Sequence, residues 1–102
     1  MHSIVSCQLI DHRPELFCAS NEQLFHIWKV GTNPDAAWSG WQQFRLPPQA
    51  TIIRTIGTHS LTDGRPQVWI DTDAGFFSMW KPNGDPKAEW TDWSKAEGPP
   101  GF

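Results

Sequence analysis

The chain repeats itself once, and this internal repeat restricts the possible folds more than any other feature of the sequence. Residues 1–50 align with residues 53–102 at a constant offset of 52 positions, without a gap. Ordinary residue frequencies would give about three identical pairs by chance. Thirteen pairs are in fact identical: Ile4/Ile56, Leu9/Leu61, Asp11/Asp63, Arg13/Arg65, Pro14/Pro66, Trp28/Trp80, Lys29/Lys81, Pro34/Pro86, Ala36/Ala88, Trp38/Trp90, Trp41/Trp93, Pro47/Pro99 and Pro48/Pro100. We therefore expect one structural domain made of two repeats, residues 1–50 and 51–102.

Each repeat is expected to contain four short β-strands. Residues 20–30 alone also suit a short helix, because Ser20 and Gln23 match a helix-capping pattern. The corresponding residues 72–82 contain Gly75 and end in a proline, which favours a turn followed by a strand in both repeats. The expected strands are residues 3–9, 15–19, 24–30 and 41–45, then 52–59, 66–71, 76–81 and 93–97, and the Pro-Pro pairs 47–48 and 99–100 end the repeats.

The third strand of each repeat is apolar on both faces, which limits how the two sheets can pack. Leu24, His26 and Trp28 alternate with Phe25 and Ile27, and the second repeat follows the same pattern. Two sheets packed face to face would leave two outer faces in water, at a cost of about 1.5–3 kcal/mol for each large side chain. Four-stranded blades in a closed ring cover one another. We therefore expect an all-β chain with two four-stranded propeller blades, and a β-propeller completed by oligomerisation.

Two blades per chain give four, six or eight blades from a dimer, trimer or tetramer, through head-to-tail contacts around a cyclic axis. A cyclic homo-trimer is the favoured expectation and a tetramer the next, because four-bladed rings are tight. The alternative is a two-sheet sandwich that dimerises through one patch.

Charge and hydropathy exclude several classes of protein. The net charge of −3 provides no basic surface for nucleic acids. No apolar run reaches the roughly 18–20 residues of a membrane span, so we expect no membrane insertion, and the first residues lack the pattern of a signal peptide. A soluble protein, cytoplasmic or released by a leaderless route, is the resulting expectation.

The two cysteines do not form a disulfide framework or a metal-binding pattern. We expect Cys7 and Cys18 to be buried free thiols. A disulfide between them is the alternative, because a hairpin turn at residues 11–14 would place them nearly opposite each other on neighbouring strands.

Several strings resemble a lectin repeat. They are LFHIWKVGTNPDAAWSGWQQF (24–44), DGRPQVWIDTDAGFFSMWK (63–81) and AEWTDW (88–93). Their turns, W-K strand end and W-S-x-W element resemble the Photorhabdus-type fucose-binding lectins, and more loosely tachylectin and tectonin repeats. The resemblance implies a β-propeller that binds fucose-like or galactose-like sugars in shallow pockets between blades, without a cofactor.

The chain departs from that family in several places. The family's seven blades lie within one chain, and an odd number cannot be built from two-blade chains. His12 and Gln23 occupy positions of turn glycines, and Thr91-Asp92 replaces Ser-Gly. The two inter-blade sites therefore need not share a ligand.

Repeated aromatic and charged residues are the candidate glycan-binding groups. Sugar recognition uses an aromatic face together with strong, charged hydrogen-bonding groups. Packing is the competing role for the tryptophans, and a salt bridge or a loop brace for the arginines, whereas Trp28 and Trp80 are expected in the core and His26 as a buried, hydrogen-bonded histidine. The candidates are Trp38, Trp41, Trp90, Trp93, Asp11, Arg13, Asp63 and Arg65.

No pattern for catalysis, metal binding or a cofactor accompanies these residues. The sequence lacks a nucleophile motif, a phosphate loop and a repeated carboxylate pair. We therefore expect a multivalent lectin rather than an enzyme. The alternative is a non-catalytic protein-interaction propeller that acts as a structural subunit.

Overall fold

The computed structural model describes residues 2–97 and contains eight β-strands. They are β1 (Ser3–Gln8), β2 (Pro14–Ala19), β3 (Leu24–Trp28), β4 (Gln42–Phe44), β5 (Ile53–Ser60), β6 (Pro66–Thr72), β7 (Gly75–Trp80) and β8 (Ser94–Ala96). Each lies within two residues of the expected position, so the sequence-based strands are confirmed. The pair Pro99–Pro100, expected to end the second repeat, lies outside the described residues.

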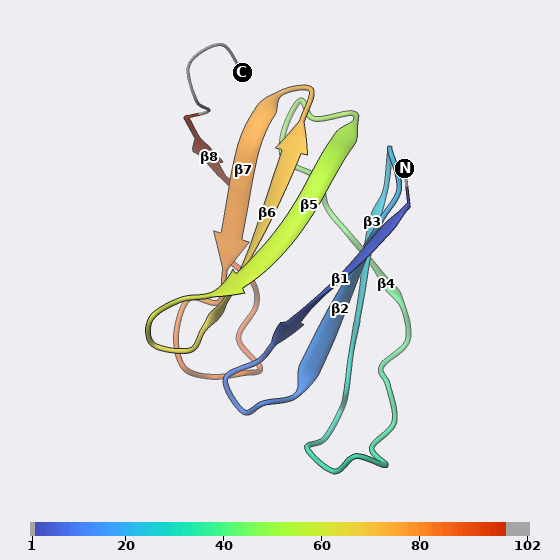
Figure 1. The fold of residues 1–102 in the computed structure, drawn as a ribbon, viewed down its shortest axis with the longest axis vertical. Helices are drawn as coiled ribbons and strands as arrows, with labels where there is room; N and C mark the ends of the chain where they lie inside the picture. The colour runs from blue at the N-terminus through green and yellow to red at the C-terminus, as the bar shows by residue number, and fades with distance from the viewer. Residues whose placement is uncertain (1, 98–102) are drawn as a thin grey trace.

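The strands form two separate four-stranded antiparallel sheets, one from each repeat (Figure 1). The first sheet has the order β1-β2-β3-β4 and the second the order β5-β6-β7-β8, so each is a simple meander. Residues 2–97 contain no helix, and hence none that could span a membrane. The all-β fold with two equivalent four-stranded sheets agrees with the expectation.

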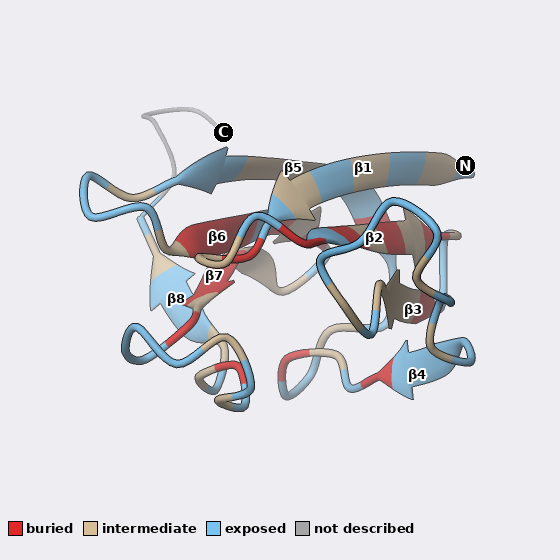
Figure 2. Ribbon diagram, turned by 90° about the horizontal axis from the view of Figure 1, so that it is seen from below, coloured by how far each residue is buried: buried red, intermediate tan, exposed pale blue. Residues whose placement is uncertain are grey.

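The two sheets meet at their first strands and diverge toward their last strands. Strands β1 and β5 lie side by side, whereas β4 and β8 are far apart (Figure 2). The Thr58 hydroxyl donates a hydrogen bond to the Ser6 carbonyl at 2.6 Å, and the Ile53 amide donates one to the Asn21 carbonyl at 2.6 Å. The arrangement is a wedge with its narrow edge at β1 and β5.

Opposite faces of the two sheets meet in the wedge. We call the side of each sheet that carries Phe17, or its counterpart Trp69, the front face, and the other side the back face. Cross-strand partners share a face, so the front face of the first sheet carries Val5, Cys7, Glu15, Phe17, Ala19, Leu24, His26, Trp28, Gln42 and Phe44. The back face of the second sheet carries Ile56, Thr58, Val68, Ile70, Phe77, Met79 and Lys95.

The hydrophobic core lies between these two faces. Its buried members are Phe17, Ala19, Leu24 and Phe44 from the first repeat, with Ile53, Val68, Met79 and Trp90 from the second. Phe17 contacts Trp90 edge-on, with a centroid distance of 5.5 Å. Phe17 therefore packs between the sheets.

The expected position of the cysteines is wrong. The register pairs Cys7 with Glu15 and Cys18 with Ile4, so the two thiols lie on opposite faces of one sheet. The tight turn after β1, closed by hydrogen bonds from Leu9 N to Arg13 O and from His12 N to Leu9 O, sets this register. Both cysteines are free thiols, as expected, but they are half-buried rather than buried.

The same turn occurs in both repeats although its sequence differs. Gly64 has a φ of 91° and His12, at the corresponding position, has a φ of 73°. Leu9 and Leu61 each donate their amide hydrogen to the arginine carbonyl that closes the turn, at 2.8 and 2.7 Å. The first repeat therefore places a histidine in the left-handed region, where glycine meets no steric penalty.

Candidate functional site

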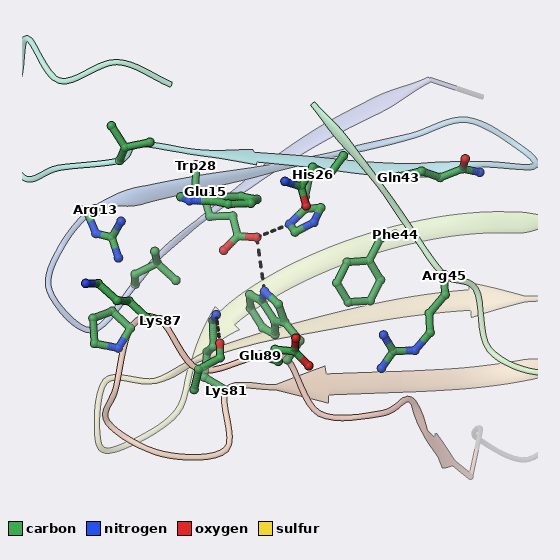
Figure 3. A pocket seen from close by; sticks show the side chains of 16 residues that line it. Arg13, Glu15, His26, Trp28, Gln43, Phe44, Arg45, Lys81, Lys87 and Glu89 are labelled. Carbon is green, nitrogen blue, oxygen red and sulfur yellow. Dashed lines mark hydrogen bonds and ion pairs between the residues drawn. The ribbon is translucent and has the colours of Figure 1, made fainter. Parts of the chain in front are cut away.

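A cavity of about 600 Å³ opens where the two sheets diverge (Figure 3). We call it the inter-sheet cavity. One wall comes from the front face of the first sheet, and the other from the segment 81–90 that follows β7. The lining residues are Leu9, Arg13, Glu15, His26, Trp28, Val30, Gln42, Gln43, Phe44, Arg45, Lys81, Pro86, Lys87, Ala88, Glu89 and Trp90.

A buried carboxylate connects the two walls of the inter-sheet cavity. Glu15 is 2% exposed, and its Oε2 lies 2.7 Å from His26 Nδ1. The same oxygen accepts a hydrogen bond from Trp90 Nε1 at 3.3 Å, across the gap between the sheets (Figure 3). The expectation of a hydrogen-bonded, largely buried His26 is confirmed, since its side chain is 12% exposed.

Aromatic rings surround this carboxylate. His26 stacks on Phe17 at a centroid distance of 5.5 Å and meets the edge of Phe44 at 5.1 Å. Trp28 lies 5.0 Å from His26 with a tilt of 38° and lines the cavity. The sequence placed Trp28 in the core, but the residue is half-buried because it lies at the opening between the two sheets. The cavity therefore has an aromatic surface available to a ligand.

Charged side chains frame the inter-sheet cavity. Lys81 donates a hydrogen bond to the Ala88 carbonyl and lies over the Trp90 indole, 5.1 Å from its centroid. Burial lowers the pKa of Lys81, and the neighbouring Glu15 carboxylate opposes that shift. Lys87 and Glu89 lie on the same loop, which a hydrogen bond from Lys87 N to Asp85 shapes at 2.9 Å. Donors and acceptors are thus both present at the cavity.

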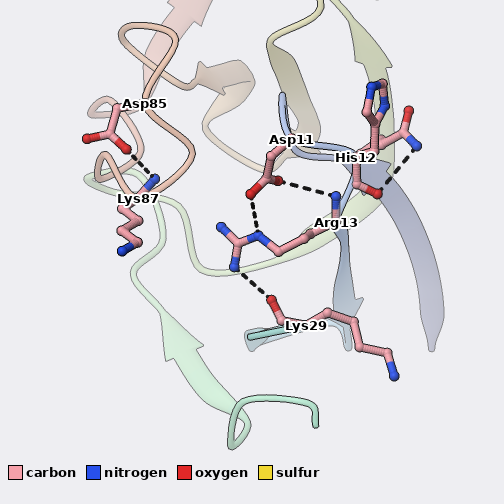
Figure 4. Close-up of polar contacts among 7 residues, drawn as sticks. Asp11, His12, Arg13, Lys29, Asp85 and Lys87 are labelled. Carbon is pink, nitrogen blue, oxygen red and sulfur yellow. Dashed lines mark hydrogen bonds and ion pairs between the residues drawn. The ribbon is translucent and has the colours of Figure 1, made fainter. Parts of the chain in front are cut away.

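Both candidate aspartate–arginine pairs hold the start of their sheet in place. Arg13 Nε donates to Asp11 at 2.6 Å, and its Nη1 donates to the Lys29 carbonyl at 2.8 Å (Figure 4). In the second repeat, Arg65 makes the corresponding bonds to Asp63 and to the Lys81 carbonyl, both at 2.7 Å. Each arginine thereby ties the turn after the first strand to the end of the third strand of its sheet.

The two pairs differ in their relation to the inter-sheet cavity. Arg13 is buried and lines the cavity. Asp11 orients the Arg13 guanidinium at the cavity end of β2 without lining the cavity itself. Asp63 and Arg65 lie in the turn between β5 and β6, away from the cavity lining, and the hydrogen bonds from Arg65 lower the pKa of Asp63.

The four candidate tryptophans have different environments in the two repeats. Trp90 is buried at the inter-sheet cavity, and Trp93 donates from Nε1 to the Arg45 carbonyl at 2.8 Å while its ring packs against Phe44. Their counterparts in the first repeat, Trp38 and Trp41, are 40% and 53% exposed. The second-repeat pair therefore joins the two sheets, and the first-repeat pair faces solvent.

Several polar residues of the cavity, among them Glu15, Gln42 and Glu89, are not among the candidates that the sequence indicated. Glu15 aligns with Gln67, Gln42 with Ser94 and Glu89 with Ala37, so a search for repeated residues passes over them. The available signal was the alternation that places Glu15 on the same face as Phe17, since a carboxylate on an apolar face requires a partner.

No protein-family model matches the chain, and no curated protein matches its sequence. Among residues 2–97, no three His, Cys, Asp or Glu side chains lie close enough together to hold a metal ion. The function must therefore be inferred from the inter-sheet cavity itself.

Proposed function

We propose that this protein binds carbohydrate, without catalysis, in the inter-sheet cavity. The observation that carries the proposal is the combination of Trp28 with the charged groups Arg13, Glu15 and Glu89 around one opening of about 600 Å³. That volume lies within the range of about 300–1,000 Å³ that is typical of small-molecule sites.

The chemistry of the lining suits a sugar. The C–H face of a pyranose packs on an indole, and its hydroxyl groups form strong hydrogen bonds with charged partners. Arg13 and Lys81 are donors, while Glu15 and Glu89 are acceptors, and all four belong to the lining. Because Arg13 is fixed by Asp11 and Glu15 by two hydrogen bonds, these groups are positioned before a ligand arrives. The resemblance to fucose-binding lectins makes fucose-like and galactose-like sugars the first to test.

The proposal includes a β-propeller that several identical chains complete. The two sheets act as neighbouring blades, with β1 and β5 nearest the axis and β4 and β8 at the rim. A trimer would provide six blades and a tetramer eight. Binding at several cavities on one rigid ring would raise the avidity for a multivalent glycan surface well above the affinity of one cavity.

Paired substitutions test the sugar site. Gln42→Ala and Glu89→Ala alter the cavity, while Gln23→Ala and Glu22→Ala remove the same residue types from an exposed turn elsewhere. We expect the first pair to weaken binding to immobilised fucose- and galactose-type glycans on the order of tenfold, because each loses a hydrogen bond to the ligand. The second pair should leave binding unchanged.

An array of these immobilised glycans also distinguishes a lectin from a protein-interaction propeller. Binding that free sugar competes away supports the lectin. A silent array together with a tight protein partner would overturn the sugar proposal and favour a protein-interaction propeller.

A further inference from the structure

We propose that the front face of the second sheet binds the back face of the first sheet of another copy, with the contacts that already join the two sheets within one chain. The inference rests on the proposed propeller. It identifies the contact between neighbouring copies, which we call the joint. It also assigns a function to Trp38 and Trp41, which the inter-sheet cavity does not use.

The internal repeat identifies the two faces. Within the chain, the front face of the first sheet packs on the back face of the second sheet. The 52-residue offset gives the equivalents of these faces, and within residues 2–97 no sheet packs against them. They are the front face of the second sheet, with Gly57, His59, Gln67, Trp69, Phe76, Ser78 and Trp80, and the back face of the first sheet, with Ile4, Ser6, Leu16, Cys18, Phe25 and Ile27.

Two pairs of equivalent residues differ in exposure between the packed faces and the faces of the proposed contact. Phe17 is fully buried, whereas its counterpart Trp69 is 36% exposed. Ile56 packs against the core, whereas its counterpart Ile4 is 66% exposed. Large apolar side chains in water are unfavourable, so a surface that covers both faces would stabilise the protein.

The Trp38 loop already has the conformation that the joint requires. Lys81 lies over Trp90 and bonds to the Ala88 carbonyl, and Lys29 lies 4.9 Å from the centroid of Trp38 and bonds to the Ala36 carbonyl at 2.7 Å. Trp90 uses this conformation to reach across the wedge to Glu15 of the first sheet. Trp38 is therefore held in the same way, but no second sheet lies across from it in the part of the chain that the structure describes.

The acceptors for both exposed tryptophans are present on the opposite face. Gln67 occupies the position of Glu15, and its side-chain carbonyl can accept the hydrogen bond of Trp38 Nε1 from another copy. The Glu97 carbonyl occupies the position of the Arg45 carbonyl, which accepts from Trp93, and can accept from Trp41. A second copy of this chain thus offers a hydrogen-bond acceptor to each exposed tryptophan.

Two charge-introducing variants test the joint, one on each face. Ile4→Glu alters the back face of the first sheet, and Trp69→Glu alters the front face of the second sheet. A carboxylate buried without a partner raises the dissociation constant on the order of 100-fold. We expect each variant alone to sediment as a single chain of 11.6 kDa at concentrations where the unaltered protein sediments as a multiple of that mass.

Mixing the two variants provides the decisive measurement. Each retains one intact face, so an equimolar mixture should form a one-to-one pair of two chains and stop there. Ile52→Glu, at an exposed isoleucine outside both faces, is the control and should assemble normally. Thermal unfolding of each variant confirms that it is folded, and Trp41→Arg, in an exposed loop, repeats the test without altering a strand.

The possible outcomes separate this inference from the proposed function. If the unaltered protein remains a single chain at high concentration, the propeller and the joint are both wrong. If the variants assemble as the unaltered protein does, or if the mixture does not form a pair, the joint alone is wrong. Single-chain variants should still bind sugar, because their inter-sheet cavity is intact.

Discussion

Trp90 and Glu15, which are 75 positions apart in the chain, are joined by a hydrogen bond of 3.3 Å across the two sheets. The same carboxylate oxygen lies 2.7 Å from His26. One buried side chain thus fixes the orientation of two aromatic residues and the distance between the walls of the cavity.

Removing this carboxylate should destabilise the protein strongly. Glu15→Ala leaves His26 and Trp90 without their shared acceptor, and we expect a loss of about 2–3 kcal/mol in the free energy of unfolding. Glu15→Gln retains an acceptor and should cost about 1 kcal/mol. Urea unfolding followed by tryptophan fluorescence measures both. A Glu15→Ala variant as stable as the unaltered protein would show that the hydrogen bonds contribute little.

Glycine in place of His12 should stabilise the turn between β1 and β2. His12→Gly removes a side chain from a backbone conformation with a φ of 73°, and we expect it to raise the free energy of unfolding by about 0.5–1 kcal/mol. Gly64→His, at the equivalent turn with a φ of 91°, should have the opposite effect. Thermal unfolding of the two variants compares them directly, and equal midpoints would contradict the explanation.

The thiol of Cys7 should resist alkylation in the folded protein. Burial, with a smaller contribution from the Glu15 carboxylate, raises its pKa to about 12. At pH 8 about one thiol in ten thousand is then ionised, and the thiolate is the reactive form. Mass spectrometry after iodoacetamide treatment, with and without urea, should show protection only in the folded state. Equal rates of modification in the two states would be incompatible with this burial.

The Asp73 carboxylate should contribute to stability in weak acid. Hydrogen bonds from the Thr51 hydroxyl and from the amides of Thr51 and Ile52 lower its pKa from 3.8 to about 2. Because the pKa is lower in the folded state, the contribution is complete above about pH 4 and is lost as the pH falls toward 2. Asp73→Asn should therefore show a shallower loss of stability across that interval. If the free energy of unfolding falls equally with pH in Asp73→Asn and in the unaltered protein, Asp73 does not make this contribution.

If the joint between copies forms, it encloses a second cavity of different chemistry. Gln67 and Ser78 would stand there in place of Glu15 and His26. Titration calorimetry of the assembled protein should then detect up to two sugar sites per chain. Ser94→Ala, at the position that corresponds to Gln42, should weaken only the site between copies, and Gln42→Ala should weaken only the site within the chain, on the order of tenfold. Loss of both sites in either variant would show that they are not independent.

The fold could be predicted from the sequence because the two repeats constrain each other. Gly75 and Pro82 in the second repeat excluded a helix for residues 20–30, and the structure places β3 there. The register of β1 on β2 was not predictable, because it depends on the number of residues in the turn. The predicted position of Cys7 relative to Cys18 failed for that reason.

The inter-sheet cavity was less predictable than the fold. Sequence identity between the repeats pointed to the tryptophans and to the aspartate–arginine pairs, and of these only Trp90 and Arg13 line the cavity. Glu15 and Gln42 differ between the repeats, so identity between the repeats provided no signal for them. Trp28 appeared to be a core residue, since alternation along a strand does not reveal where two sheets diverge.

Head-to-tail contacts between identical chains do not by themselves limit the number of chains in an assembly. If copies join as proposed, the angle between the two sheets of the wedge decides whether the assembly closes. With a suitable angle, the last copy meets the first and the object is finite. With a slightly different angle, the same contact faces would produce an open helical filament. If copies join as proposed, the hydrogen bond between Thr58 and Ser6, at the narrow edge of the wedge, helps to set the angle between neighbouring sheets and therefore the number of copies in a closed ring.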